Sequence, residues 1–340
     1  MRRWGNVFLI VLMGVIGVTI GSLEGQGKEE KKMEKEGEKK VAEEMRPERI
    51  GRFAIDVPAV MHRAGQGFSL RYAEIEEVVW PEGKSREEAR QEVWEANLAE
   101  VQKKTPPEGK EEVVIETKEF SDLGFWSKGV LYYGDRIDDE TVYWDVLKDA
   151  GPVGVWFRIH GLSKEMMIKN FTNIAKSYRY IAGGGVTGVL DGNWFYLQHG
   201  AINLPYLEQE NAYVRFEGHP LGLTLEIKMN STHETRPVPN LLERIEVAIR
   251  ERFAPGLDVS RVRSQKRTVA GIPGEEVILR MTERGKASFL FGWDYLGRKD
   301  SGEYPRIVIK MDAFDDKHLQ EQTLLWDRML DSMKPMYRAQ

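Results

Sequence analysis

Hydrophobic and polar residues alternate with a period of two over many short segments of the chain after Gly51. In residues 52–57, for example, Phe53, Ile55 and Val57 are separated by other positions, and such alternation predicts β-strands with one buried face. The strands predicted in the first part of the chain are 52–57, 68–75, 113–120, 127–133, 141–146 and 153–159. Those predicted in the second part are 194–197, 213–216, 221–227, 261–269, 276–281, 287–295 and 306–311.

Helical spacing replaces this alternation in four segments. Ser85 stands three residues before Glu88, which is a capping box, and the helix it begins is stopped by Thr105-Pro106-Pro107. A second helix begins after Pro239-Asn240 and is stopped by Pro255-Gly256. Two longer helices repeat apolar positions in steps of four, three and four, at Met167, Phe171, Ile174 and Tyr178 and at Leu319, Thr323, Trp326 and Leu330.

The same order of elements therefore occurs twice. Each copy has strands, a helix, several further strands and a closing helix, and the meanders predict antiparallel sheets. We predict an α+β fold with two similar domains, each an antiparallel sheet with helices packed on one face. The predicted bounds are a signal peptide or membrane anchor at 1–23, a charged linker at 24–48, an N-terminal domain at 49–181, a Gly-rich hinge at 182–187 and a C-terminal domain at 188–340.

The N-terminal segment is typical of export. Arg2 and Arg3 precede an apolar stretch from Val7 to Ile20, and this order predicts that the arginines stay inside while the rest is delivered outside. Its length is between that of a signal-peptide core and that of a spanning helix, which needs about 20 residues, so cleavage and anchoring both stay open. We expect a periplasmic protein, either released or tethered to the inner membrane through residues 4–23.

Composition and charge exclude several classes of function. The chain of 340 residues has a net charge of -5, which provides no cationic surface for nucleic acid, and it has no cysteine for a thiol nucleophile or a thiolate metal site. The six histidines, at positions 62, 160, 199, 219, 233 and 318, show no paired metal-ligand spacing. We therefore predict no nucleic-acid partner.

Known catalytic and cofactor patterns point away from an enzyme. The nucleophile pattern G-x-S-x-G does not occur in the sequence. Gly183, Gly185 and Gly188 match the dinucleotide fingerprint, but they follow a predicted helix where a strand is required. The acidic runs at 138–140 and 315–316 fit a hairpin turn and a helix start. We predict no catalytic residue, no cofactor and no metal.

Several stretches resemble the immunity proteins that protect bacteria against type VI secretion phospholipase effectors, in particular those cognate to the fourth lipase-effector class. The stretches are Ile50-Gly51-Arg52-Phe53-Ala54-Ile55-Asp56-Val57-Pro58, Gly192 to Ile202, Val269-Ala270-Gly271-Ile272-Pro273-Gly274-Glu275-Glu276 and Phe291-Gly292-Trp293-Asp294. The resemblance implies a non-enzymatic periplasmic protein that binds its cognate phospholipase effector and blocks substrate access or lid opening. The two alternatives are an envelope scaffold or assembly factor and a periplasmic enzyme.

Anchors for a protein partner are expected beside turns rather than at periodic core positions. Trp126, Trp194, Tyr206 and Arg236 meet this condition, and aromatic and arginine side chains are the commonest anchors of protein interfaces. Ordinary packing or a solvated surface is the alternative interpretation for each of them.

Overall fold

The structure of the chain is a computed structural model. It describes residues 43–134, 136–137, 139–161, 163–181, 192–206, 209–232, 239–251, 257–314 and 316–337. The predicted export segment, the Gly-rich hinge, Arg236, His233 and the predicted stop at Pro255-Gly256 lie outside these residues. Glu44–Gln340 forms one compact unit, and the predicted division into domains stays a prediction.

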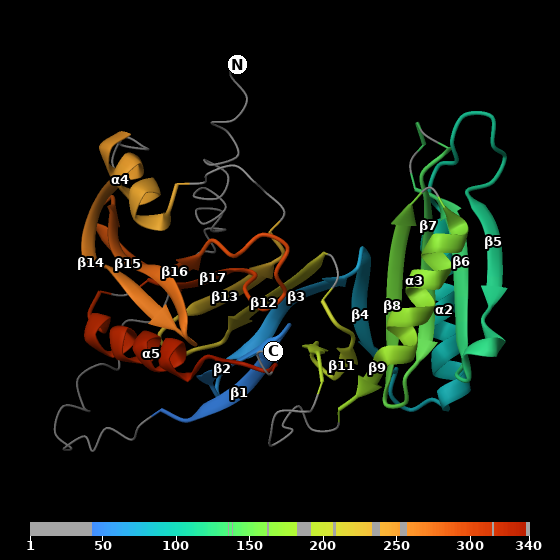
Figure 1. Cartoon of the computed structure of the whole chain (residues 1–340), viewed down its shortest axis with the longest axis horizontal. Helices are drawn as coiled ribbons and strands as arrows, with labels where there is room; N and C mark the ends of the chain where they lie inside the picture. The colour runs from blue at the N-terminus through green and yellow to red at the C-terminus, as the bar shows by residue number, and fades with distance from the viewer. Residues whose placement is uncertain are drawn as a thin grey trace, which may run out of the picture. The chain divides into compact units, whose positions relative to one another are not determined.

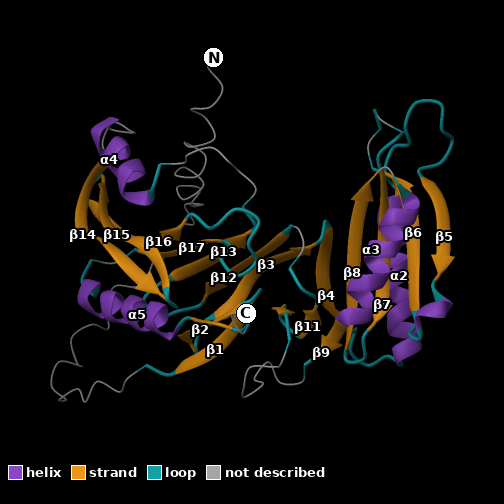
Figure 2. Cartoon of the chain, viewed as in Figure 1, coloured by secondary structure: helices purple, strands orange, loops and turns teal. Residues whose placement is uncertain are grey.

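Twelve antiparallel strands form the main sheet, in the order β14-β15-β16-β17-β13-β12-β3-β4-β8-β7-β6-β5 (Figure 1, Figure 2). The first six along the chain are β3 (His62–Leu70), β4 (Ala73–Val79), β5 (Val114–Glu119), β6 (Ser127–Tyr133), β7 (Val142–Asp149) and β8 (Val153–Gly161). The other six are β12 (Glu210–Glu217), β13 (Thr224–Asn230), β14 (Leu257–Val269), β15 (Ile272–Glu283), β16 (Lys286–Tyr295) and β17 (Arg306–Ala313).

The order of strands is the same in the two halves of the sheet. Read from its outer edge, one half is β5-β6-β7-β8-β4-β3 and the other is β14-β15-β16-β17-β13-β12, and the halves join where β3 pairs with β12. Each half carries two helices at the same places along the chain: α2 (Arg86–Gln102) and α3 (Lys164–Ser177) in the first, α4 (Leu241–Glu251) and α5 (Leu319–Ser332) in the second. The antiparallel α+β class is confirmed.

The two helices of each half lie on opposite faces of the sheet rather than on one, which corrects that part of the prediction. Trp94 of α2 stacks on Trp156 with ring centroids 6.3 Å apart, whereas Phe171 of α3 contacts Phe157 at 5.5 Å. Consecutive strand residues point to opposite faces, so an apolar pair such as Trp156 and Phe157 needs cover on both sides.

Two small sheets pack beside the large one. One is formed by β1 (Met45–Ile50), β2 (Phe53–Pro58) and β18 (Lys334–Pro335), and the other by β9 (Tyr178–Tyr180), β10 (Trp194–Tyr196) and β11 (Gly200–Asn203). The opening strands predicted at 52–57 and 194–197 are thus outside the twelve-stranded sheet. The alternation identified them as strands, but strand partners depend on register, which local pattern does not encode.

Local turn geometry divides one predicted strand in two. The segment 68–75 is a hairpin, because Arg71 and Tyr72 have φ angles of 50° and 66° and reverse the chain between β3 and β4. The usual signal for such a turn is Asn-Gly or a related pair, which is lacking here.

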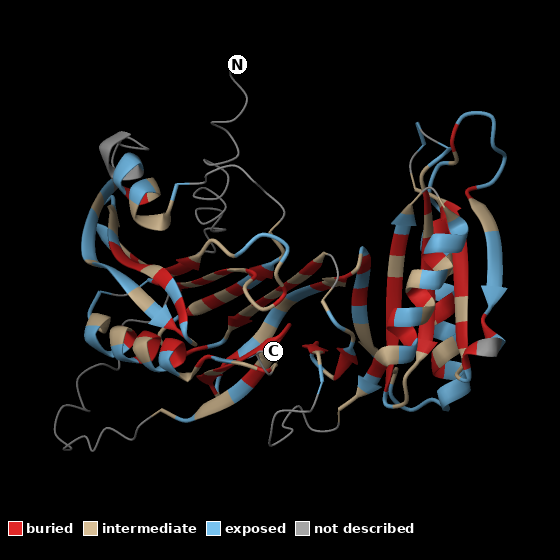
Figure 3. Ribbon diagram, viewed as in Figure 1, coloured by how far each residue is buried: buried red, intermediate tan, exposed pale blue. Residues whose placement is uncertain are grey.

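Apolar side chains from both halves form the main core (Figure 3). The stripe predicted on α3 is buried at Met167, Phe171 and Ile174, and Tyr178 is buried just after the helix. On α5 the buried stripe is Gln322, Leu325, Trp326, Met329 and Leu330, so the predicted Leu319 and Thr323 lie at its margin. A single 3-10 turn, η1 (Ser121–Leu123), precedes β6.

Candidate partner-binding surface

Helices α2 and α4 lie on the same face of the large sheet. Trp156, covered by α2, pairs with Glu76 of β4, and directly paired residues point to the same face. At the other end, Ile245 of α4 packs on Val277, which pairs with Gly292 of β16. Following the register from Glu76 across β3, β12, β13 and β17 leads to Gly292 on that same face.

Between these helices the sheet presents a polar surface, which we call the open face. The apolar clusters under α2 and α4 extend only as far as β4 and β16, and the residues between them are exposed or half-buried. The open face consists of Glu74, Glu76, Gly65, Gly67, Tyr213, Arg215, Glu226, Lys228, Val308 and Lys310. A broad strand platform bordered by two helices is therefore available to a partner.

Charges of both signs alternate across the open face. Glu226 lies between Arg215 and Lys228, with its carboxylate oxygens 4.0 Å from Arg215 Nη1 and 3.9 Å from Lys228 Nζ. In the other half, Arg158 Nη1 lies 2.5 Å from Glu76 Oε2. Exposed pairs of this kind add little to stability, but an ordered pattern of charges can select a partner with the complementary pattern.

The first half has a pair of opposite charges on equivalent strands. Arg158 of β8 is paired in register with Glu74 of β4, and Lys310 of β17 is paired with Glu226 of β13. The strand order makes β8 equivalent to β17 and β4 equivalent to β13. Each half thus pairs a base with an acid across the same two equivalent strands of its sheet.

Strand β3 contributes almost no side chain to the open face. A Cβ atom at Gly67 would have nothing within 4 Å, and one at Gly65 would lie 4.0 Å from Cε1 of Tyr213. Burial raises the pKa of Tyr213, whose ring lies 5.1 Å from Lys228 Nζ. Glycine in a strand interior often marks a place where another backbone can approach closely. The glycines of β3 therefore form a flat floor in the middle of the open face.

The main sheet is weakly connected where β3 meets β4. These strands share three residue pairs, whereas β3 shares eight with β12. Beyond the shared pairs, Glu77 of β4 accepts hydrogen bonds from the Tyr178 hydroxyl at 2.6 Å and from the backbone N–H groups of Gln198 and His199 at 2.9 and 2.7 Å. Glu77 therefore holds the β10–β11 turn at the point where the two strands separate.

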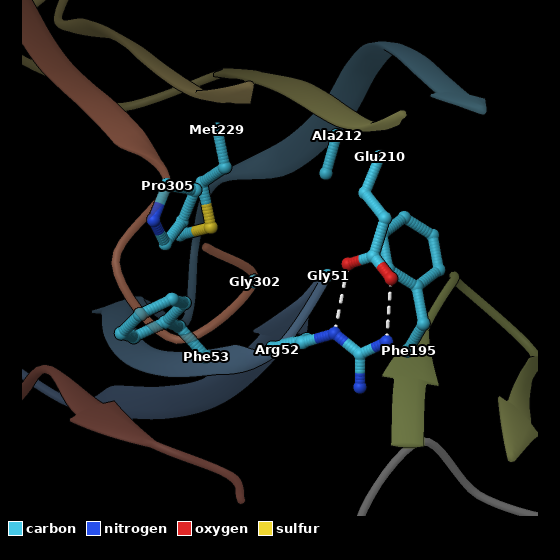
Figure 4. A pocket seen from close by; sticks show the side chains of 9 residues that line it. All are labelled: Gly51, Arg52, Phe53, Phe195, Glu210, Ala212, Met229, Gly302 and Pro305. Carbon is cyan, nitrogen blue, oxygen red and sulfur yellow. Dashed lines mark hydrogen bonds and ion pairs between the residues drawn. The ribbon is translucent and has the colours of Figure 1, made fainter. Parts of the chain in front are cut away.

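A buried ion pair attaches the first small sheet to the large one. Arg52 Nε donates to Glu210 Oε2 at 2.7 Å (Figure 4). Arg52 Nη2 also donates to the Leu204 carbonyl at 3.0 Å. The pair lines a pocket, which is otherwise bordered by Gly51, Phe53, Phe195, Ala212, Met229, Gly302 and Pro305. Because the charges satisfy each other and the surroundings are largely apolar, the pocket offers no acid–base pair for chemistry.

The three predicted anchors that the structure describes are not brought together by the fold. Trp126 is half-buried beneath the Arg90 guanidinium, 4.9 Å from its ring centroid. Trp194 is 4% exposed and packs in the cluster that contains Tyr196 and Met336, which favours its alternative interpretation as a packing residue. Tyr206 is half-buried against Gly302. Arg236 lies outside the described residues, and the role of all four as anchors stays a prediction.

An ionic network beneath α5 explains two of the sequence stretches that resemble the immunity proteins. Glu276, fully buried, accepts hydrogen bonds from Trp326 Nε1 at 2.7 Å, Arg263 Nη2 at 2.6 Å and Arg267 Nη1 at 3.2 Å. Burial acts to raise the pKa of Asp327, but Arg263 and Arg267 hold it below its ordinary value. Gly274 leaves room for Trp293, since a Cβ there would lie 2.5 Å from that ring.

Metal-binding and membrane-spanning features are lacking in the described part of the chain. No group of three or more histidine, aspartate or glutamate side chains there could hold a metal ion. His160 stacks on Tyr143 with ring centroids 5.3 Å apart, and His219 accepts a hydrogen bond from the Leu221 N–H. Among the helices described, none has the length and apolar character needed to cross a membrane.

Comparison with known proteins finds one matching family model and several solved structures with a similar fold. Residues 195–337 match the family model described as Tle cognate immunity protein 4 C-terminal domain. No curated protein matches the chain in sequence.

Three solved structures that resemble the chain are of the immunity protein TplEi and of the Tle4–Tli4 complex. Apo immunity protein TplEi of the type VI secretion system (T6SS) from Pseudomonas aeruginosa has a TM-score of 0.68 at 19% identity, covering 86% of this chain and 97% of that one. The Tle4–Tli4 complex has a TM-score of 0.69 at 19% identity, with the same coverage. TplEi complexed with "L" peptide has a TM-score of 0.65 at 19% identity, covering 86% and 98%. At this identity the structures establish the fold alone. The expected resemblance is thereby confirmed for residues 195–337, which match the model of the C-terminal domain of the Tle cognate immunity protein 4 family.

Proposed function

We propose that this protein is an immunity protein that binds a cognate type VI secretion phospholipase effector and inhibits it by occluding its active site or blocking lid opening. The observation that carries the proposal is the match of residues 195–337 to the C-terminal domain of the Tle cognate immunity protein 4 family. The shared fold with TplEi and with a chain of the Tle4–Tli4 complex supports it.

The surface proposed to receive the effector is the open face. It spans five strands between α2 and α4, and it combines an aromatic ring at Tyr213 with paired charges and a glycine floor. A stable inhibitory complex buries about 1,200–2,000 Å² in total, which requires a broad surface rather than a small pocket. Strands paired by hydrogen bonds also supply a surface that loses little conformational entropy on binding.

The proposed inhibitor acts by binding and carries no reaction of its own. Several buried charges of the described residues form structural pairs, such as Arg52 with Glu210 and Arg263 with Glu276. A family of immunity proteins implies a non-enzymatic role. In the pocket that Arg52 and Glu210 line, the two charges are paired with each other, which favours a structural role over catalysis.

The periplasm is the proposed site of action. The N-terminal sequence, with Arg2 and Arg3 before the apolar stretch Val7 to Ile20, has the order expected of an exported or anchored protein. An inhibitor of a phospholipase that attacks membrane lipids from the periplasm must be present there. Cleavage and anchoring of the segment are both compatible with this proposal.

Phospholipase assays test the proposal directly. The effector is the phospholipase encoded beside this gene, and its activity on mixed micelles is measured with and without an equal molar amount of the full chain. Stoichiometric loss of activity is the expected result. Unchanged activity, together with no complex on gel filtration, would overturn the proposal and favour a scaffold or an enzyme.

Charge reversal tests the proposed surface separately. Lys228→Glu on the open face removes the cation beside Glu226 and Tyr213, and we expect it to weaken effector binding at least tenfold. The matched control is Lys103→Glu at the end of α2, where the side chain is also largely exposed but lies off the open face. Equal affinity of both variants and the unmodified chain would exclude this surface.

A further inference from the structure

Three two-residue turns of this chain share one backbone geometry but not one sequence. Ala270-Gly271 connects β14 and β15, with φ angles of 54° and 76°, and Arg284-Gly285 connects β15 and β16, with 50° and 78°. The third turn, Arg71-Tyr72, connects β3 and β4 with φ angles of 50° and 66°. The chain uses glycine at the second position twice and tyrosine once.

Tyrosine is an unfavourable residue for this position. At a positive φ the Cβ of an L-residue approaches the following carbonyl oxygen, whereas glycine has no Cβ and no such cost. Type I′ hairpin turns accordingly favour Asn-Gly, and bulky residues there are uncommon. At 71–72 neither residue is glycine, so the turn has a strained conformation that the other two turns largely avoid.

Three contacts, two from the connection between β11 and β12 and one from α3, hold the strained turn in place. The Arg71 N–H donates to the Gln209 carbonyl at 2.7 Å, and Arg71 Nη2 donates to the Pro205 carbonyl at 2.8 Å. Asn170 of α3 donates through Nδ2 to the Arg71 carbonyl. Strain that is fixed by surrounding structure in this way is found most often at functional sites.

The side chain that results is presented to solvent. Tyr72 is 50% exposed. Two residues further along the chain, Glu74 pairs with Ser69 and lies on the open face. Tyr72 thus stands at the end of the open face where β3 turns into β4.

We propose that Tyr72 is an anchor that enters an apolar pocket of the cognate phospholipase effector, and that the strain of the turn is retained for this purpose. The inference rests on the proposed function and deepens it. Tyrosine is among the residues that most often dominate binding energy. Continuity with the open face identifies the effector, rather than a second copy of this chain, as the occupant.

Tyr72→Gly separates strain from recognition, because it gives this turn the same sequence as Arg284-Gly285. We expect the variant of the full chain to raise the Tm by about 1–4 °C while weakening effector affinity at least tenfold. Tyr72→Phe keeps the ring, so its affinity should stay within about threefold of the unmodified chain.

A matched control comes from the second turn. Arg284→Asn creates Asn-Gly at an exposed turn away from the open face, so it should raise the Tm without changing the affinity. An unchanged affinity in Tyr72→Gly, or a lowered Tm, would overturn the anchor. If the unmodified chain does not bind the effector at all, the proposed function fails, and this inference fails with it.

Discussion

Lys148 of β7 is a buried cation that no described carboxylate neutralises. Its Nζ donates to the Ala175 carbonyl at 2.5 Å, near the C-terminal end of α3, and lies 4.1 Å from the centroid of the Phe125 ring. The negative end of the helix dipole offsets part of the cost of burying this charge. Burial nevertheless lowers the pKa of Lys148 to about 8.

The lowered pKa predicts a rise in stability with pH. Between about pH 8 and the ordinary lysine pKa, the folded state releases the Lys148 proton while the unfolded state keeps it, so the free energy of unfolding increases with pH. We expect the urea midpoint to increase from about pH 7.5 to about pH 8.5, where unfolded tyrosines, with a pKa of about 10, are still almost fully protonated. Lys148→Met should abolish this rise, and a rise of the same size in that variant would contradict the assignment.

Glu276 has the opposite role, since it is a buried anion with several donors. Glu276→Ala would leave Arg263, Arg267 and Trp326 Nε1 without their shared acceptor, which we expect to cost about 3–5 kcal/mol in the free energy of unfolding. Asp331→Ala removes an exposed partner of Arg267 and should cost less than about 1 kcal/mol. Denaturant unfolding measures the loss in the free energy of unfolding for each variant. Equal losses would contradict the role of Glu276 as the shared acceptor of the network.

At the scale of elements, close contacts between strands and side chains depend on particular glycines. Gly274 of β15 lies where a Cβ would approach Trp293 to 2.5 Å, and Trp293 is fully buried. Gly67 of β3 lies on the open face with nothing within 4 Å of a Cβ. Both glycines lie in strands, but there is room for a Cβ atom at Gly67 and none at Gly274.

Alanine substitutions at these glycines should have different effects. Gly274→Ala forces Trp293 or its strand to move, and we expect a loss of about 1–3 kcal/mol in the free energy of unfolding. Gly67→Ala should change stability by less than about 1 kcal/mol, because its methyl group enters open space. Thermal unfolding measures both, and a neutral Gly274→Ala would show that the contact relaxes without cost.

Sequence predicted those elements whose signals are local. The Ser85 side chain accepts from Glu88 N–H and the Glu88 side chain accepts from Ser85 N–H, as the capping box requires. The strand predicted at 127–133 coincides with β6, and the stripe on α3 is buried at Met167 and Phe171. Each of these depends on residues close together in the chain.

Features that depend on register or on an atypical turn could not be predicted in this way. Arg71-Tyr72 gives no turn signal, so the pattern predicts a single strand where the structure has the hairpin of β3 and β4. The open face collects Arg215 and Glu226 from neighbouring strands with Lys310 from far along the chain, through pairings that no local pattern encodes. The face on which each helix packs also follows from register alone.

For the whole molecule, the shared sheet joins the two repeats of strands. Strand β3 precedes the first repeat's helix α2 in the chain, yet it pairs at eight positions with β12 of the second repeat. The termini of the described chain also meet, because β18 pairs with β2 and Ser332 Oγ accepts from the Asp56 N–H at 2.8 Å. Both repeats are thereby connected through segments distant in sequence.

This connection predicts one cooperative unfolding transition. Hydrogen exchange measured by mass spectrometry at increasing urea should show β6–β8 and β15–β17 opening at the same denaturant concentration. The reason is that β3 of one half and β12 of the other cover each other's strand edges, so unfolding of either half exposes an edge of the other. Opening of β6–β8 at a lower urea concentration, with β15–β17 still protected, would instead indicate two independent units.

The position of β3 also bears on how such a protein can be divided into fragments. A fragment that contains only residues 192–337, close to the matched family domain, would lack β3 and leave one edge of β12 bare. Bare strand edges attract other strands, so we expect this fragment to self-associate. Adding residues 43–181 as a separate polypeptide should restore a monomeric complex, in which the two pieces of chain complement each other without a covalent link.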